Sequence, residues 1–153
     1  MGTAVLPLLA AAKARVVATA DNPADGEALR RIGADQIVGF AESDYPEDVD
    51  VVLNLVLFSD RLPAAAQPLR PGGRLVTIIY PPPTVEELGR DDVDLHFVMD
   101  LEGKHGGMRD VAEAAASGLL VATIGDRYEL EDAVAAAVAY SRRDTLGKVI
   151  VTM

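Results

Sequence analysis

Two groups in the middle of the chain have side chains suited to proton transfer or anion binding. Tyr80 directly follows an apolar run, so at the end of a strand it could donate a proton to a substrate. Lys104 and His105 lie in a glycine-flanked stretch and could bind an anion. Each also has a plainer interpretation, because strand-end aromatic residues often only pack and solvated loops are commonly charged. The sequence therefore assigns no catalytic residue.

His96 and a group of aspartates are the next residues whose side chains could contact a ligand or a metal ion. His96 alternates with apolar neighbours and lies beside Phe97, which is typical of a strand residue on a wetter face. Asp91, Asp92 and Asp94 resemble the clustered carboxylates that hard cations prefer. Neighbouring aspartates are more often a solvated surface, so we expect no metal.

Composition limits the classes of partner. The 153 residues carry a formal charge of −10 and no cysteine. This charge disfavours nucleic acid and anionic membranes, and the cysteine count excludes disulfides and thiolate metal sites. The apolar stretch from Ala4 to Ala12 is too short to span a bilayer. We expect one cytoplasmic domain over residues 1–153.

Apolar runs of strand length alternate with helical stretches, which is typical of an α/β fold with a three-layer, doubly wound, mostly parallel sheet. The predicted strands are Arg15–Ala20, Gln36–Phe40, Val49–Val56, Leu75–Ile79, Val93–Met99, Leu119–Ile124 and Lys148–Met153. The predicted helices are Thr3–Ala14, Ala24–Ile32, Asp60–Leu69, Met108–Ser117 and Leu130–Tyr140, with regular helix beginning near Leu6 because of Pro7. Tyr80–Asp92 is predicted as a loop or a short helix beginning near Thr84.

The stretch from Leu69 to Ile79 is central to this prediction. Pro71, Gly72 and Gly73 predict a turn, and the unalternating apolar run from Leu75 to Ile79 predicts a strand buried on both faces. A ligand in such a sheet lies beyond the carboxyl ends of the strands, here near Tyr80.

Five segments, taken in order, resemble the cofactor-binding half of the medium-chain dehydrogenase/reductase superfamily, in its zinc-free, quinone oxidoreductase-like branch. They are Arg15–Ala20, Leu29–Asp35, Val49–Asn54, Leu69–Val76 and Gly147–Val151. The resemblance covers nearly the whole chain. It implies a Rossmann-like fold and the use of NADPH or NADH to reduce a quinone or an activated carbon–carbon double bond by hydride transfer.

The resemblance also implies which residues face the cofactor. They are Thr19, Ala20, Asp21 and Asn22 after one strand, Val56 and Leu57 after another, Ile79 and Tyr80 after a third, and Phe97, Val98 and Met99 near the nicotinamide. Asp21 could bond the ribose hydroxyls of NADH, or it could be a turn former before Asn22 and Pro23. The family's acidic position falls on Ala20, which favours NADP over NAD.

Two departures from the family pattern accompany the matches. The family's first strand and its glycine-rich, pyrophosphate-binding turn have no counterpart, and only Gly2 could be a remnant. We therefore expect a truncated domain, weak or absent activity, and unpaired edges on Arg15–Ala20 and Val51–Val56. In the family, residues from about Val121 to Met153 return to a catalytic domain. Val56, Leu57 and Phe58 also stand where the family has a glycine, and they could crowd a cofactor.

Two other functions remain open. The chain could be a non-catalytic interaction module that forms a homodimer through the strand from Val93 to Met99. It could also be an S-adenosylmethionine-dependent methyltransferase, because that group shares the pattern of Leu69–Arg74. The match at Gly33, Ala34 and Asp35 disfavours the methyltransferase.

Overall fold

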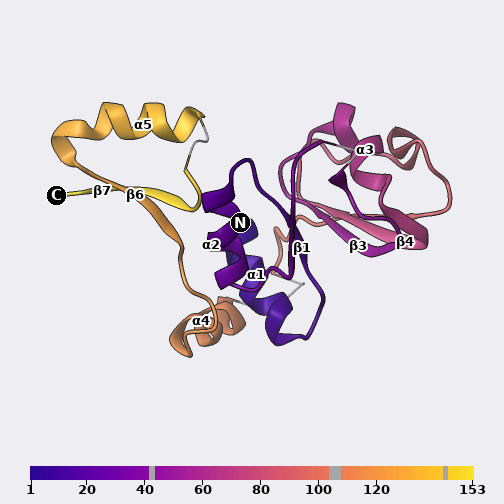
Figure 1. Cartoon of the computed structure of the whole chain (residues 1–153), viewed down its shortest axis with the longest axis horizontal. Coiled ribbons are helices and arrows are strands. Elements are labelled where there is room, and N and C mark those ends of the chain that lie inside the picture. Colours follow the sequence, from indigo (N-terminus) through magenta and orange to yellow (C-terminus); the bar gives the residue numbers. More distant parts are fainter. Residues whose placement is uncertain (42–43, 104–107, 143–144) are drawn as a thin grey trace. The chain divides into compact units, whose positions relative to one another are not determined.

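The computed structural model describes residues 1–41, 44–103, 108–142 and 145–153. The chain divides into two compact units, drawn in Figure 1. The first unit joins Met1–Ile37 to Met108–Met153, and the second is Val38–Gly107. Each unit has a hydrophobic cluster of its own.

The first unit begins with helix α1 (Gly2–Ala11), strand β1 (Val17–Thr19), helix α2 (Pro23–Arg31) and strand β2 (Gln36–Val38). The expectation that regular helix starts near Leu6 is wrong, because α1 already begins at Gly2 and contains Pro7. Proline forfeits one helical hydrogen bond. Leu6 and Leu9 of the same helix pack into the cluster, and their burial offsets that loss.

The core of this part consists of Leu6, Val16, Leu29 and Ala34, which are all buried. Helix α2 is held at its start by Asn22, whose side-chain oxygen accepts the N–H of Asp25 at 2.9 Å. Pro23 occupies the first helical turn, where no donor is needed. As predicted, the helix ends before Gly33, which has a φ of +121°.

The remainder of the first unit is helix α4 (Met108–Ala116), strand β6 (Ile124–Glu129), the 3₁₀ turn η4 (Leu130–Asp132), helix α5 (Ala133–Arg142) and strand β7 (Lys148–Thr152). Strands β6 and β7 pair in parallel. The predicted strand Leu119–Ile124 is displaced, since β6 begins at Ile124. Pairing sets this boundary, because Lys148 lies opposite Ile124 and Val151 opposite Tyr128.

The second unit is a three-stranded parallel sheet in the order β3 (Val49–Asn54), β4 (Leu69–Thr77), β5 (Asp94–Phe97). The 3₁₀ turn η2 (Ser59–Arg61) and helix α3 (Leu62–Ala66) connect β3 to β4, and η3 (Val85–Leu88) precedes β5. The predicted short helix near Thr84 is confirmed by η3. Because all three strands run the same way, their carboxyl ends share one edge.

The predicted turn at Pro71, Gly72 and Gly73 lies inside β4. Val49 pairs with Leu69 and Val51 with Arg74, so extra residues bulge out of β4 between these pairs. Gly72 supplies the left-handed backbone conformation there, with a φ of +70°, and its N–H donates to the carbonyl of Asp92 at 2.7 Å. The bulge therefore bonds the start of β4 to the segment that leads into β5.

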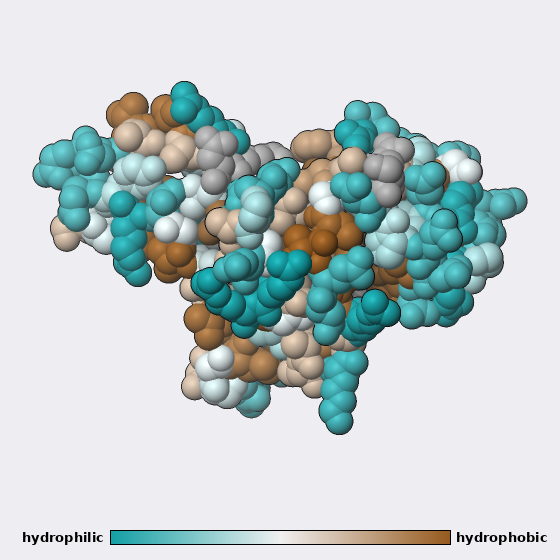
Figure 2. All heavy atoms as spheres, in the orientation of Figure 1, coloured by the Kyte–Doolittle hydropathy of each residue, from teal (hydrophilic) through white to brown (hydrophobic). Residues whose placement is uncertain are grey.

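The core of the second unit lies on one side of this sheet. Leu62, Leu75 and Leu88 are almost completely buried. For the run predicted to be buried on both faces, Leu75–Ile79, the structure leaves Leu75 and Thr77 completely buried and the other three residues half-buried. The predicted buried strand at β3 is less covered, because Val51 is 47% exposed and Leu53 38% exposed. In the described part of this unit, α3 contacts β3 and β4, and the outward-facing side chains have no such cover. Figure 2 shows apolar side chains in patches among the hydrophilic ones.

Within the described residues the strands form three sheets, β1-β2, β3-β4-β5 and β6-β7. The predicted α/β class with parallel pairing is confirmed.

Candidate functional site

Asn54 organises the carboxyl edge of the three-stranded sheet. It is the last residue of β3 and is only 3% exposed. Its side-chain oxygen accepts the N–H of Leu57 at 2.8 Å and that of Val56 at 3.3 Å. Its amide nitrogen donates to the Leu57 carbonyl at 2.8 Å. One buried side chain thus fixes the turn that follows β3.

The same amide reaches across to β4. It lies 3.2 Å from the hydroxyl oxygen of Thr77, which is completely buried. That hydroxyl also accepts the N–H of Ile79 at 3.3 Å. The two segments predicted to face a ligand, Val56–Leu57 and Ile79–Tyr80, are therefore held by one hydrogen-bond network.

The predicted ligand-facing residues of this unit are unequally exposed. Tyr80 is 69% exposed, Val56 is 50% exposed, and Val98 and Met99 are also on the surface. Leu57 turns inward instead and packs against the core cluster. Three side chains were expected to crowd a ligand here. Leu57 no longer does so, because it points into the core, whereas Val56 and Phe58 stay on the surface, with Phe58 56% exposed.

The described residues at this edge leave little room for a ligand. The space bordered by Leu57, Leu62, Thr77, Ile79, Pro81 and Pro83 has an accessible volume of about 0 Å³. Pockets for small ligands generally begin at about 300 Å³. A ligand at this edge would therefore lie over the exposed side chains rather than inside the unit.

The remaining predicted ligand-facing residues lie in the first unit. Thr19 is the last residue of β1, and Ala20, Asp21 and Asn22 follow it. Thr19, Asp21 and Asn22 are exposed, and Ala20 is half-buried. The Asn22 side chain is occupied by α2, since its oxygen accepts from Asp25 N and its amide donates to the Asp25 carboxylate at 2.9 Å. Asp21 is consequently the carboxylate at this strand end that is left to meet a ligand. Gly2 is exposed as the first residue of α1.

Comparison with known proteins assigns the family. A family model described as zinc-binding dehydrogenase matches residues 32–151. The chain belongs to the zinc-binding dehydrogenase family. It corresponds to the C-terminal half of a medium-chain dehydrogenase/reductase, as predicted.

Solved structures of such enzymes share the fold. An NAD-dependent alcohol dehydrogenase matches with a TM-score of 0.78 at 17% identity over 99% of this chain and 47% of its own. A quinone oxidoreductase from Pseudomonas syringae pv. Tomato DC3000 matches with a TM-score of 0.73 at 20% identity, over 99% of this chain and 53% of its own. A mycobacterial protein solved in complex with NADPH matches with a TM-score of 0.76 at 21% identity, with the same coverage of 99% and 53%. The chain thus spans about half the length of these structures. A comparison with curated proteins finds no match.

The family's name raises the question of zinc. Within the described ranges, no group of three or more His, Cys, Asp or Glu side chains gathers in a way that could hold a metal ion. Asp92, one of the clustered aspartates, accepts two hydrogen bonds from Arg90, at 2.8 and 2.7 Å. This arginine lowers the pKa of the Asp92 carboxyl below its usual range, chiefly through hydrogen bonding.

The other predicted polar residues lie apart from any pocket described so far. His96 is exposed on β5, which confirms its place on the wetter face. Lys104 and His105 lie outside the described residues. No helix in the described ranges is long and apolar enough to cross a membrane.

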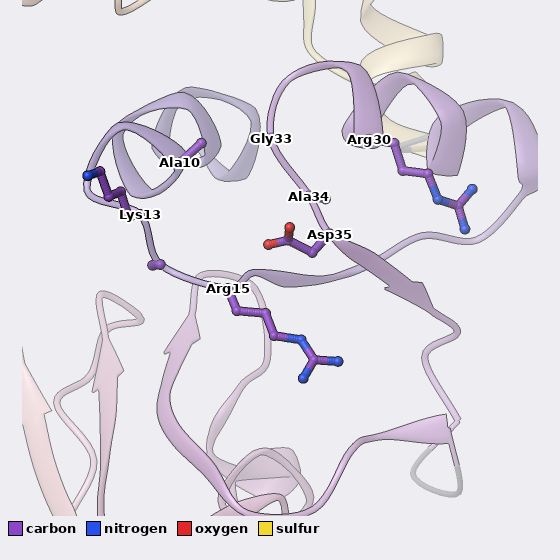
Figure 3. A pocket seen from close by; sticks show the side chains of 8 residues that line it. Ala10, Lys13, Arg15, Arg30, Gly33, Ala34 and Asp35 are labelled. Atoms are coloured by element: carbon purple, nitrogen blue, oxygen red, sulfur yellow. The ribbon is translucent and has the colours of Figure 1, made fainter.

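The sequence reasoning missed two features. One is the Asn54–Thr77 network, which a polar residue at the end of an otherwise apolar run could have indicated. The other is a charged hollow in the first unit, lined by residues that include Lys13, Arg15 and Arg30 (Figure 3). These cations are scattered along the chain and meet only in the fold.

Proposed function

We propose that this member of the family is an NAD(P)H-dependent oxidoreductase of the quinone or enone reductase type. The observation that carries the proposal is the family match over residues 32–151, which includes the ordered edge of β3, β4 and β5. The cofactor would supply a hydride to the quinone or the double bond, leaving NAD(P)⁺, and the solvent would supply the one proton that completes the reduction. The protein's part is to bind and orient the cofactor.

The cofactor residues follow from the same proposal. Thr19, Ala20 and Asp21 would meet the adenosine ribose. Val56, Ile79 and Tyr80 would lie beside the cofactor, and the segment from Phe97 to Met99 would lie near the nicotinamide. Exposed apolar side chains at the β3-β4-β5 edge suit the flat face of a nicotinamide ring. The sequence has no Gly-x-Gly-x-x-Gly turn, so we expect weak binding and slow turnover.

We propose NADPH as the preferred cofactor and the cytoplasm as the compartment. Ala20 stands where the family places the carboxylate that selects NADH. The preference for NADPH can be tested at the exposed Asp21. If Asp21 bonds the ribose hydroxyls, Asp21→Asn weakens NADH binding. If it lies beside the ribose without bonding its hydroxyls, as we propose, the substitution leaves NADH binding nearly unchanged and strengthens NADPH binding by removing a negative charge near the 2′-phosphate.

A thermal-shift titration of the purified chain tests the cofactor proposal, because a ligand that binds only the native state raises its stability. We expect NADPH to raise the unfolding temperature more than NADH, and S-adenosylmethionine to leave it unchanged. A shift with S-adenosylmethionine alone would favour the methyltransferase. No shift with any of the three would overturn cofactor binding. Oxidation of NADPH with quinones and enones then measures turnover.

A second candidate is a homodimer formed through β5. This strand is an outer strand of the three-stranded sheet and pairs only with β4 among the described residues. Unpaired strand edges are templates for another chain. Light scattering over a hundredfold range of protein concentration tests this candidate, and a monomer throughout would exclude it.

A further inference from the structure

A hollow of about 590 Å³ lies where α1 and α2 both end and where the chain enters β1. Its volume is typical of small-molecule pockets, which range from about 300 to 1,000 Å³. Part of the lining consists of small residues, namely Ala10, Ala14, Gly33 and Ala34. Gly33 has no Cβ, and one placed there would lie 2.8 Å from that of Ala10. The close approach of the two helix ends thus depends on small residues.

Charged side chains complete the lining. Lys13, Arg15 and Arg30 are exposed, and none has an ion-pair partner within the described residues. This contrasts with the neighbouring Arg31, whose guanidinium lies 3.1 Å from the Glu27 carboxylate. In a chain with a formal charge of −10, three unpaired cations around one hollow are a local excess of positive charge.

Asp35 is the carboxylate of the hollow. One of its oxygens accepts the N–H of Val16 at 2.7 Å, which fixes the side chain. Figure 3 shows this carboxylate near the middle of the lining, with the charged ends of Lys13, Arg15 and Arg30 pointing away from it in three different directions. The remaining carboxylate oxygen can accept a hydrogen bond from a ligand.

Helix ends alone do not account for this arrangement. Cations in the last turn of a helix complement its dipole, which explains Arg30 and, just past α1, Lys13. Arg15 lies beyond the end of α1, so a helix dipole does not account for it. Because the cations are spread out, a compact ion would meet only one of them. An organic anion of larger span would meet several and could offer a hydroxyl to Asp35.

We propose that this hollow binds a small phosphate ester that carries hydroxyl groups, such as a sugar phosphate. Its phosphate groups meet Arg15, Arg30 and Lys13, and a hydroxyl donates to Asp35. The site lies at the amino end of β1, whereas Asp21 follows the carboxyl end of that strand. It does not depend on dinucleotide binding.

Isothermal titration at low ionic strength tests the site, with fructose 1,6-bisphosphate as the probe and the full chain as the protein. We expect saturable binding that Arg15→Gln and Arg30→Gln each weaken by about three- to fivefold. Arg31→Gln is the matched control, because it removes the same charge one residue away from the lining and should change binding by less than about twofold. An equal effect of all three variants, or no saturable binding to the wild-type chain, would overturn the proposal.

Asp35→Asn tests the hydroxyl contact. Asparagine can still accept the Val16 N–H, so the local fold is kept, but it is a weaker acceptor and carries no charge. We expect tighter binding of inorganic pyrophosphate, which has no alcohol hydroxyl, and a smaller preference for the sugar bisphosphate over pyrophosphate. If both ligands gain equally, the hollow binds anions without recognising a hydroxyl, and the proposed ligand class is wrong.

Discussion

The amide nitrogen of Asn54 lies 3.2 Å from the hydroxyl oxygen of Thr77, and this buried contact joins the carboxyl ends of β3 and β4. Both residues are almost completely enclosed, and within the described residues no buried side-chain nitrogen or oxygen atom is left without a hydrogen-bond partner. A polar pair in this position is stable because every group is satisfied. The hydrogen bonds of this pair fix the two turns that carry Val56 and Tyr80.

Replacing Asn54 should therefore lower the free energy of unfolding by more than replacing an exposed polar residue does. Asn54→Ala leaves the N–H and carbonyl groups of Leu57 without their partner, and we expect a loss of about 2–4 kcal/mol in the free energy of unfolding. Thr77→Val keeps the shape but removes the hydroxyl, and should cost about 1–2 kcal/mol. Urea unfolding measures both. If the double variant loses no less than the sum of the two single losses, the contact contributes nothing as a pair.

Asn54→Asp separates hydrogen bonding from volume. A carboxylate can accept from Leu57 N and Val56 N but cannot donate to the Leu57 carbonyl at 2.8 Å. Burial would favour the protonated form and raise the folded-state pKa of the new carboxyl. The variant should thus be most stable below the unfolded-state pKa and lose stability as the pH rises through the folded-state pKa. A flat stability profile between pH 3 and 8 would contradict this expectation.

Arg90 ties two parts of the second unit together. Its guanidinium donates to the carbonyls of Ala66 at 2.9 Å and Leu69 at 2.7 Å, beyond its two bonds to Asp92. The pairing raises the pKa of Arg90, chiefly through the Asp92 hydrogen bond. Arg90→Met keeps the stem but leaves the end of α3 without these donors, and we expect a loss of about 1–3 kcal/mol by urea unfolding. Arg61→Met, in the same unit, is a comparison that leaves these carbonyls bonded.

The same pair makes stability depend on acid. Because Arg90 lowers the pKa of Asp92, its carboxylate stabilises the folded state above the unfolded-state value, near 3.8. That contribution is lost as the pH falls through the lower, folded-state pKa. Urea unfolding between pH 6 and 2 should show this loss in the wild-type chain and a smaller one in Arg90→Met. Equal acid sensitivity of the two proteins would rule out the pair as its source.

Local patterns in the sequence were enough to predict the class of fold and most elements. The spacing of Asn22, Pro23 and Gly33 predicts both ends of α2. The structure confirms the start by the hydrogen bond that Asn22 accepts from Asp25 N, and the end by the positive φ of Gly33. Strand edges were less predictable, because hydrogen-bonded pairing sets them. Thus β6 begins where Lys148 lies opposite Ile124, which is the last residue of the strand that the apolar run predicted.

Burial was harder to predict for the same reason. The apolar run of β3 is typical of a buried strand, yet Val51 and Leu53 are exposed because cover depends on neighbours that a local pattern does not specify. The proposed phosphate ester site was beyond local patterns altogether. Lys13, Arg15 and Arg30 lie on separate segments and surround one hollow only because Gly33 and Ala10 allow the helix ends to approach.

The cap of α2 offers a clean test of a local interaction. Asn22→Ala removes the acceptor of the Asp25 N–H, and we expect a loss of about 1 kcal/mol. Asn22→Ser keeps an acceptor at the helix start without placing a second carboxylate beside that of Asp25, and should restore most of that loss. Thermal unfolding measures both variants. Equal destabilisation by alanine and serine would mean that the amide's bond to the Asp25 carboxylate, and not the cap, stabilises the helix.

Gly33 provides the sharpest test of the packing in the first unit. Its φ of +121° is rarely adopted by other residues, and a Cβ there would lie 2.8 Å from the Ala10 Cβ and 3.2 Å from the Leu6 carbonyl oxygen. Gly33→Ala thus combines backbone strain with a clash against α1, and we expect a loss of at least about 2 kcal/mol in the free energy of unfolding. Gly118 is the matched control, because its φ is +76° and nothing lies within 4 Å of the added Cβ. Gly118→Ala should cost only the left-handed strain of about 1 kcal/mol. Equal losses in the two variants, measured by urea unfolding, would show that α1 does not pack on Gly33.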